Sequence, residues 1–229
     1  MKRLLVASIL GCGLVVARAA EPPRTWSDDF THGLDAWAVE QQPGGTVTAM
    51  DNVLRIDDRG GCTVWFRPRL TAPVVISYEA RMLSTGRVSD LNCFWMASDP
   101  AHPGDLLAHR RDGKFASYDS LLTYYVGVGG NNNTTTRFRR YDGTGARPLA
   151  PEFDHRDRAD LLDGDRTYRI RIVVAGDGHV QFLRDDKLLF DFRDPKPLLA
   201  GWFGFRTVQS RIEIRHFRVE ESSGSAISH

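Results

Sequence analysis

Cysteine is scarce in this 229-residue chain, which has 3 cysteines, and its Cys and His residues match no metal-binding spacing. Zinc sites need several such ligands close together, so we expect no zinc and no cofactor. Cys62 and Cys93 both lie in runs of β-prone residues. In an oxidising compartment they pair if their strands are neighbours, and free buried thiols are the open alternative.

Lysine is also rare, and most cations of the chain are arginines. Lysine and arginine together number 30 against 29 acidic residues, so the formal net charge is only +1. A chain this close to neutral has no bulk charge to hold nucleic acid or an anionic membrane surface, so neither is an expected partner. Positive charge is concentrated only locally, at Arg137, Arg139 and Arg140.

Long apolar runs are missing except at the N-terminus, where residues 4–16 follow Lys2 and Arg3. Residues 17–19, Ala-Arg-Ala, have the small-x-small spacing of a signal-peptidase site, so residues 1–19 are predicted to be a signal peptide. We therefore expect a secreted or periplasmic protein. A lipoprotein with a lipidated Cys12 is disfavoured, because the apolar run continues beyond that residue. No other stretch is long enough to span a bilayer.

Amphipathic helical periodicity is absent as well, and short β-prone runs separated by turns take its place. The spacing between turns, roughly ten residues, is typical of sandwich proteins. We predict an all-β, single-domain β-sandwich of the jelly-roll type, with two curved antiparallel sheets. The domain is predicted to span residues 24–220, followed by a flexible tail at 221–229. The clearest early runs are residues 37–40, 46–50, 53–57, 62–66 and 74–82.

The segment from Ser117 to Tyr141 differs from generic β-sequence, and its centre is predicted to be a hairpin. Residues 124–129 are aromatic and β-branched, residues 130–133 (Gly-Asn-Asn-Asn) favour a turn, and residues 134–141 form an arginine-rich run. Side chains alternate across a strand, so one face carries tyrosine, glycine and arginine together. We predict that this face is an anion-binding groove on the concave sheet. Its members are Tyr125, Gly127, Gly129, Arg137, Arg139 and Tyr141.

A long loop at residues 97–117 precedes this hairpin, and long loops in compact domains are usually functional or disordered. His109 and Arg110 are predicted to lie at the rim of the groove. Asn92, in the strand before the loop, is predicted to lie at its edge. The alternative, without a binding function, is that the strand glycines mark a bulge and the arginines are solvated surface residues.

The last third of the chain carries three strand patterns that belong together. They are Arg-Asp-Asp-Lys-Leu-Leu at residues 184–189, Gly-Trp-Phe-Gly-Phe-Arg at 201–206, and a final strand at 211–219. With the opening residues 26–37, they resemble the concanavalin A-like lectin/glucanase superfamily. The resemblance covers nearly all of residues 26–220 and implies that fold, which hosts hydrolases, lyases and passive sugar binders. The middle of the chain also resembles a secreted bacterial family of unknown function associated with polysaccharide degradation.

Glucanases of this superfamily typically carry Glu-x-Asp-x-x-Glu on one strand, and this run is absent here. Hydrolysis by a flanking pair of carboxyl groups is therefore disfavoured, and a glycosidase that uses scattered acids such as Glu152 and Asp154 is an alternative. Several sandwiches of the superfamily hold a structural calcium ion. That resemblance makes calcium binding through Asp28 and Asp29 an open option.

Residues 125–131 resemble the Tyr-x-x-Gly-x-Tyr-x-Gln strand of polysaccharide lyases with a jelly-roll fold, and depart from it at Gly130. The resemblance implies β-elimination from an acidic, uronate-containing polysaccharide, in which arginine and amide groups neutralise the carboxylate. Tyr125 or His109 is the expected base, and Tyr118 or Tyr141 the expected acid. A non-catalytic, lectin-like sugar-binding module is the alternative. The predicted substrate-binding residues are Arg137, Arg139, Asn131, Asn92, Arg110 and Tyr124.

Overall fold

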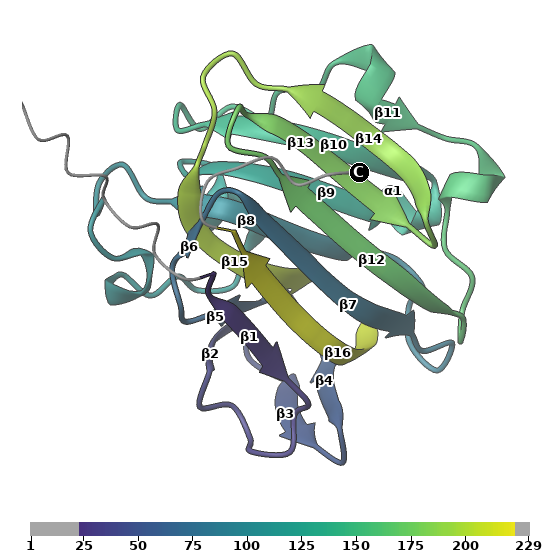
Figure 1. Cartoon of the computed structure of the whole chain (residues 1–229). Coiled ribbons are helices and arrows are strands. Elements are labelled where there is room, and N and C mark those ends of the chain that lie inside the picture. The colour runs from purple at the N-terminus through teal and green to yellow at the C-terminus, as the bar shows by residue number, and fades with distance from the viewer. Residues whose placement is uncertain (1–22, 223–229) are drawn as a thin grey trace, which may run out of the picture.

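A computed structural model describes residues 23–222, so the predicted signal peptide lies outside the described residues. Two antiparallel sheets face each other, as the sequence predicts for a β-sandwich (Figure 1). One of them, sheet A, is toward the viewer in Figure 1, where β12, β7 and β16 lie side by side. Its strands, in spatial order, are β14 (Lys187–Arg193), β13 (His179–Arg184), β12 (Thr167–Val174), β7 (Val74–Met82), β16 (Arg211–Glu221), β4 (Val53–Asp57) and β3 (Thr46–Met50), with β1 (Thr25–Asp28) also paired to β16.

Sheet B carries the predicted hairpin and lies behind sheet A in Figure 1. Its strands, in spatial order, are β11 (Asp154–His155), β10 (Thr135–Asp142), β9 (Leu122–Gly129), β8 (Leu91–Ser98), β15 (Ala200–Thr207), β5 (Cys62–Phe66) and β2 (Trp37–Gln41), with β6 (Leu70–Thr71) also paired to β15. The helical turns are short: η1 (Leu106–Ala108), η2 (Phe115–Tyr118), α1 (Gly130–Asn133), η3 (Pro151–Phe153) and η4 (Arg158–Asp160).

The main core fills the space between the two sheets. Strand β7 shows why, because its residues alternate between buried and partly exposed along its whole length. Its buried members, Ile76 and Tyr78 among them, meet aromatic side chains such as Phe203, Phe205 and Phe217. Burial of each large apolar side chain stabilises the fold by about 1.5–3 kcal/mol.

A second apolar cluster lies on the outer side of sheet B. Residues 99–121 cross this outer face, and we call them the covering segment. Phe115 and Tyr118 of the covering segment stack on Phe94 of β8. Strand β8 is therefore covered on both faces, which explains why all of its residues except the last are buried. The sequence predicts a long loop here, but not that it closes over the sheet.

The two cysteines are buried and free. Cys62 lies on β5 and Cys93 on β8, and β15 runs between these two strands. The pairing that the sequence left open requires neighbouring strands, so the free-thiol alternative holds.

The predicted tail begins too early by at least one residue. Glu221 is the last residue of β16. Its carboxylate accepts hydrogen bonds from Arg24 at 2.8 Å and from the Thr71 amide at 2.6 Å, and these bonds hold the end of the strand in place. Within residues 23–222, no helix has the length and apolar character needed to cross a membrane.

Candidate functional site

The hairpin at β9 and β10 forms as predicted, with Arg137 opposite Gly127 and Arg139 opposite Tyr125. Its turn contains Asn131, Asn132 and Asn133, whose φ angles are 53°, 58° and 59°. Asparagine tolerates positive φ better than most residues, so the three consecutive asparagines account for this turn.

A row of residues, polar at every position except Gly127, crosses seven strands of sheet B on its outer face. The strand registers place these residues side by side from β2 to β11. We call them the polar row. In spatial order they are Glu40, Thr63, Arg206, Asn92, Gly127, Arg137 and Asp154.

Aromatic side chains form the neighbouring row, and the covering segment buries them. Tyr125 packs against Phe94 and Phe115, with ring centroids 5.2 Å and 5.4 Å away, and retains 6% exposure. Tyr141 meets Tyr125 edge-on at 6.0 Å. Burial raises the pKa of Tyr125 well above its ordinary value, and Arg206 and Arg139 act weakly in the opposite direction. Tyr125 therefore keeps its proton at neutral pH.

The space above Gly127 is occupied by the hydroxyl of Tyr125. A Cβ at Gly127 would lie 2.6 Å from that oxygen and 3.2 Å from Oδ1 of Asn92. A Cβ at Gly129 would meet Leu162 at 2.5 Å. The expectation of an open, glycine-floored trough is therefore wrong, because the chain's own side chains fill it. The Tyr125 hydroxyl lies over Gly127 beside Oδ1 of Asn92, and Arg137 is the residue opposite Gly127 on β10.

Guanidinium groups dominate the charge on this face. Arg137 makes a two-pronged pair with Asp154, at 2.7 and 3.2 Å, and this pair lowers the pKa of Asp154 to about 2. Arg139 instead donates to the carbonyl oxygens of Arg147 and Pro148, at 2.5 and 3.2 Å. Among the described residues it has no carboxylate partner, so its charge is not neutralised locally.

Arg206 is fully buried under the covering segment. Its Nη1 donates to Oγ1 of Thr63 at 3.1 Å and to the carbonyl of Gly113 at 2.6 Å. Its Nε and Nη2 have no hydrogen-bond partner within the described part of the chain. Buried polar groups nearly always make a hydrogen bond, so a buried guanidinium group with two donors that lack an acceptor is uncommon.

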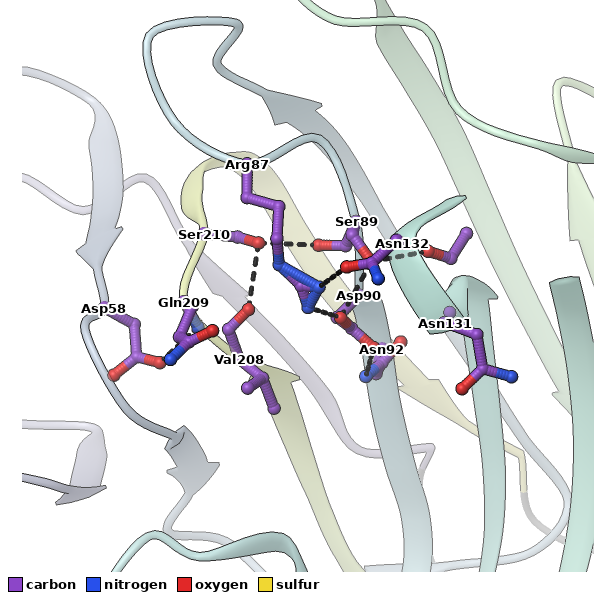
Figure 2. A network of polar contacts seen from close by, with 12 residues as sticks. Asp58, Arg87, Ser89, Asp90, Asn92, Asn131, Asn132, Val208, Gln209 and Ser210 are labelled. Carbon is purple, nitrogen blue, oxygen red and sulfur yellow. Dashed lines mark hydrogen bonds and ion pairs between the residues drawn. The ribbon is translucent and has the colours of Figure 1, made fainter. Parts of the chain in front are cut away.

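Asp90 organises the end of the polar row nearest the hairpin turn (Figure 2). Its carboxylate accepts from the side chains of Arg87 and Ser89, and Nδ2 of Asn92 lies 3.4 Å from its Oδ1. Arg87 also reaches Oδ1 of Asn132 in the hairpin turn, at 3.2 Å. Asp90 has a φ of 63°, a strained conformation that this set of contacts maintains.

Residues 56–217, more than half of the chain, match the family described as "Domain of unknown function (DUF6250)". The chain belongs to the DUF6250 family. A comparison of this DUF6250 chain with curated protein sequences finds no match.

Solved structures share the fold of the DUF6250 chain at low sequence identity. A Bacillus subtilis protein of unknown function with a galectin-like fold is 16% identical with a TM-score of 0.68, covering 90% of this chain and 99% of the other. The carbohydrate-binding module CBM66 from Bacillus subtilis is 14% identical (TM-score 0.57; 82% and 96% covered). LamA_E269S from Z. galactanivorans, in complex with laminaritriose and laminaritetraose, is 8% identical (TM-score 0.57; 89% and 100% covered). The fold is therefore concanavalin A-like and is shared with carbohydrate-binding modules, lectins and glucanases.

Three of the predicted tyrosines of the DUF6250 chain do not bring a hydroxyl to the polar row near Gly127. Tyr124 points into the main core, where its hydroxyl donates to Asp194 at 2.7 Å, so its predicted contact with substrate is wrong. Tyr118 belongs to the covering segment and donates to Glu40 of β2 at 2.8 Å, and burial raises its pKa. Tyr141 is 1% exposed, and burial raises its pKa to about 12. Only Tyr125 brings a hydroxyl to the polar row near Gly127.

His109 and Arg110 lie across the sheet from the hairpin. Arg110 donates to the carbonyl of Val39 on β2 at 3.1 Å, and the His109 ring stacks on His102 with centroids 4.5 Å apart. Strand β2 is separated from β9 by three strands, which corresponds to about 19 Å. The predicted grouping of His109 and Arg110 with the hairpin residues is therefore wrong.

The remaining predicted residues have local roles in the structure. Asn131 is exposed in the turn, and its Nδ2 lies 3.4 Å from Oγ1 of Thr135. Asp28 accepts from Nε1 of Trp37 at 2.7 Å, and Asp29 accepts from the hydroxyl of Thr31 at 2.6 Å. Within residues 23–222, no group of three or more His, Cys, Asp or Glu side chains forms a possible metal site.

The sequence does not indicate the contacts that Arg206, Asp90 and Glu40 make in this region. Arg206 belongs to the Gly-Trp-Phe-Gly-Phe-Arg pattern, which indicates only a strand of the fold. Its buried position depends on Gly113, far away in the chain. A signal was present for Asp90, because an acidic residue directly precedes an apolar strand.

Proposed function

We propose that this DUF6250 protein is exported and binds an acidic, uronate-containing saccharide on the outer face of β9 and β10. The observation that carries the proposal is the partly exposed guanidinium group of Arg139, which has no carboxylate partner among the described residues. Arg139 lies opposite Tyr125 in the register of β9 and β10. A ligand carboxylate supplies the negative charge that this face lacks.

The contacts of such a ligand follow from the geometry of the face. Arg139 is partly exposed and binds carbonyl oxygens through Nη1, which leaves its other donors for a carboxylate. A guanidinium fork matches the two oxygens of a carboxylate. Tyr125 offers a phenolic hydroxyl to a sugar hydroxyl, and Arg137 extends the binding face toward β11. The fold relatives named above include a carbohydrate-binding module and an oligosaccharide complex, which supports a saccharide as the ligand class.

A second candidate is β-elimination at this face, with Tyr125 as the proton carrier. As a phenolate, which the raised pKa of Tyr125 confines to alkaline pH, its oxygen can remove the C5 proton of a uronate. The phenol so formed can then return that proton to the leaving oxygen, while arginine stabilises the charge of the carboxylate. The position of the hydroxyl between Asn92 and the arginines favours this reaction over hydrolysis. Hydrolysis needs two free carboxyl groups, and Asp90 and Asp154 are both bound by arginine.

The test is a titration of the chain lacking residues 1–19 with oligogalacturonate and with neutral laminari-oligosaccharides. We expect oligogalacturonate to bind at least tenfold more tightly. Arg139→Gln should weaken that binding by about tenfold or more, because a hydrogen bond to a charged group contributes about 1.5–3 kcal/mol. Arg193→Gln, which removes an exposed arginine on sheet A, is the matched control and should have no effect.

Equal binding of neutral and acidic oligosaccharides, or unchanged binding by Arg139→Gln, would overturn the binding proposal. Elimination is tested in the same samples by the ultraviolet absorbance of the new conjugated double bond. An absorbance rise that Tyr125→Phe abolishes supports the second candidate. Binding without any rise leaves the protein as a sugar-binding module.

A further inference from the structure

A β-bulge interrupts β16 in the middle of sheet A. The register between β16 and β7 shifts between Arg215 and Arg218, so His216 and Phe217 together occupy the space of one residue. Phe217 points into the core and is 1% exposed, whereas His216 has a φ of 53° and a side chain that is 73% exposed. Bulges often re-aim a side chain beside a functional site. This one turns His216 onto the outer face of sheet A.

A shallow cavity of about 270 Å³ lies beside His216 on that face. Ser77 of β7 forms part of its floor, and Arg171 of β12 forms part of its wall. A neighbouring hollow of about 420 Å³, lined in part by His32 and Arg218, continues on the other side of His216. His216 lines both hollows, and we call the two hollows together the depression; they follow the central strands that face the viewer in Figure 1.

Two arginines flank Ser77 in one row across the sheet. Arg171 pairs with Ser77 on one side, and Arg218 pairs with Ser77 on the other. The two arginines are thus two strand spacings apart, about 10 Å. The side chain of Ser77 is short, which leaves room between them for a ligand group that both guanidinium groups can reach.

Carboxylates also line the depression, Glu79 and Asp186 on one side of His216 and Asp28 and Asp29 on the other. Asp186 accepts from Arg169 at 2.7 Å, and Glu220 accepts from Arg218 at 2.7 Å. Glu79 lies 3.8 Å from Nε2 of His216. Arg171 is exposed and has no carboxylate partner among residues 23–222. Arg171 is therefore a cation beside Ser77 that is available to a ligand anion.

We propose that this depression is a second binding site, for an oxyanion group carried by a saccharide. The group, a sulfate ester or a uronate carboxylate, lies over Ser77 and accepts hydrogen bonds from Arg171, Arg218 and the Ser77 hydroxyl. His216, presented by the bulge, contacts the adjoining sugar ring. The site is on sheet A and uses no residue of the hairpin, so it does not depend on the function proposed for sheet B. A saccharide long enough to pass around the sandwich edge can engage both faces.

The experiment is amide NMR of the chain lacking residues 1–19, titrated separately with inorganic sulfate, a sulfated oligosaccharide and oligogalacturonate. We expect shifts at Ser77, Arg171 and Arg218 that saturate with the saccharide probes. Arg171→Gln should weaken this binding at least tenfold. Arg193→Gln, at an exposed arginine on β14 that lines neither hollow, should leave the shifts at Ser77 unchanged. The saccharide that saturates at lower concentration identifies the group as sulfate ester or carboxylate.

Saturation by inorganic sulfate as tight as by either saccharide would overturn the saccharide part of the proposal. The absence of shifts at Ser77 with all three probes would overturn the site itself. So would shifts that Arg171→Gln leaves unchanged, because the arginine would then have no role. Arg171 is exposed, so its substitution is expected to leave the fold intact, and the unperturbed spectrum of the variant checks this.

Discussion

Gly127 and Tyr125 form a matched pair on β9, because the missing side chain of the glycine leaves room for the tyrosine hydroxyl. The two residues lie on the same face of the strand, and the phenol folds along the strand over its neighbour. The glycine thus fixes where the phenolic hydroxyl lies relative to Asn92. Any function of Tyr125 depends on this arrangement.

Gly127→Ala tests the pair directly. The new methyl group would lie 2.6 Å from the Tyr125 hydroxyl oxygen, so the phenol must move. We expect the free energy of unfolding to fall by about 1–3 kcal/mol, the usual range for an overpacked site. Urea denaturation followed by fluorescence measures it.

Tyr125→Phe in the same chain should recover part of that loss, because it removes the oxygen that the methyl group meets. The double variant should therefore be more stable than Gly127→Ala alone. Strict additivity of the two substitutions would show that the oxygen and the methyl group do not interact.

Arg206 shows why single residues are harder to predict than strands. Its sequence neighbours fix its strand and face, but not the loop that lies over it. Gly113 and Thr63, which accept its hydrogen bonds, come from segments far away in the chain. Similarly, the glycines of β9 suggested ligand access, whereas only the structure shows that Tyr125 and Leu162 fill the space.

At the scale of elements, the hairpin and the covering segment represent the two extremes of what sequence can predict. Strands β9 and β10 follow from alternation, β-branched residues and a turn that tolerates positive φ. The covering segment has no periodicity, and the apolar residues that it packs against the sheet, Leu106, Phe115 and Tyr118, are irregularly spaced. Its length alone indicated that it was unusual. Its docking depends on long-range contacts that no local pattern encodes.

Glu40 anchors the covering segment to the sheet. Its carboxylate accepts from the amide of Arg111 and the hydroxyl of Tyr118, each at 2.8 Å, and from Nε1 of Trp65 at 2.8 Å. The Arg111 amide and the Trp65 indole can only donate. An amide side chain at position 40 therefore leaves one of these donors without an acceptor.

We expect Glu40→Gln to cost about 1–3 kcal/mol of stability, the usual penalty for an unsatisfied buried group. Amide hydrogen exchange should accelerate within residues 99–121 more than in the main core. Glu152→Gln, at an exposed glutamate, is the control. Equal exchange in the variant and the parent chain would show that the carboxylate does not anchor the segment.

On the scale of the whole molecule, the sandwich holds its two thiols out of reach of solvent. Cys62 and Cys93 are buried on separate strands, and burial raises the pKa of both, that of Cys93 to about 12. The thiolate is the reactive form, so neither should react in the native state. In a chain without residues 1–19, we expect a thiol reagent to label both cysteines only in urea. A reductant should leave the unfolding midpoint unchanged.

Rapid labelling of the native chain would contradict this expectation. A midpoint lowered by reductant would show that the cysteines pair in the exported protein. Serine at both positions provides the matched control for the labelling, because it removes the thiols.

The pairing of β1 with β16 has a consequence for how this domain can be joined to others. Thr25 lies opposite Glu220, and Arg24 donates a hydrogen bond to the carboxylate of Glu221. The first and last described strands therefore lie side by side in sheet A. Polypeptide attached before residue 23 and after residue 222 departs from neighbouring points. The domain can therefore be inserted within a loop of another protein, or circularly permuted through a short linker, with its strand order unchanged.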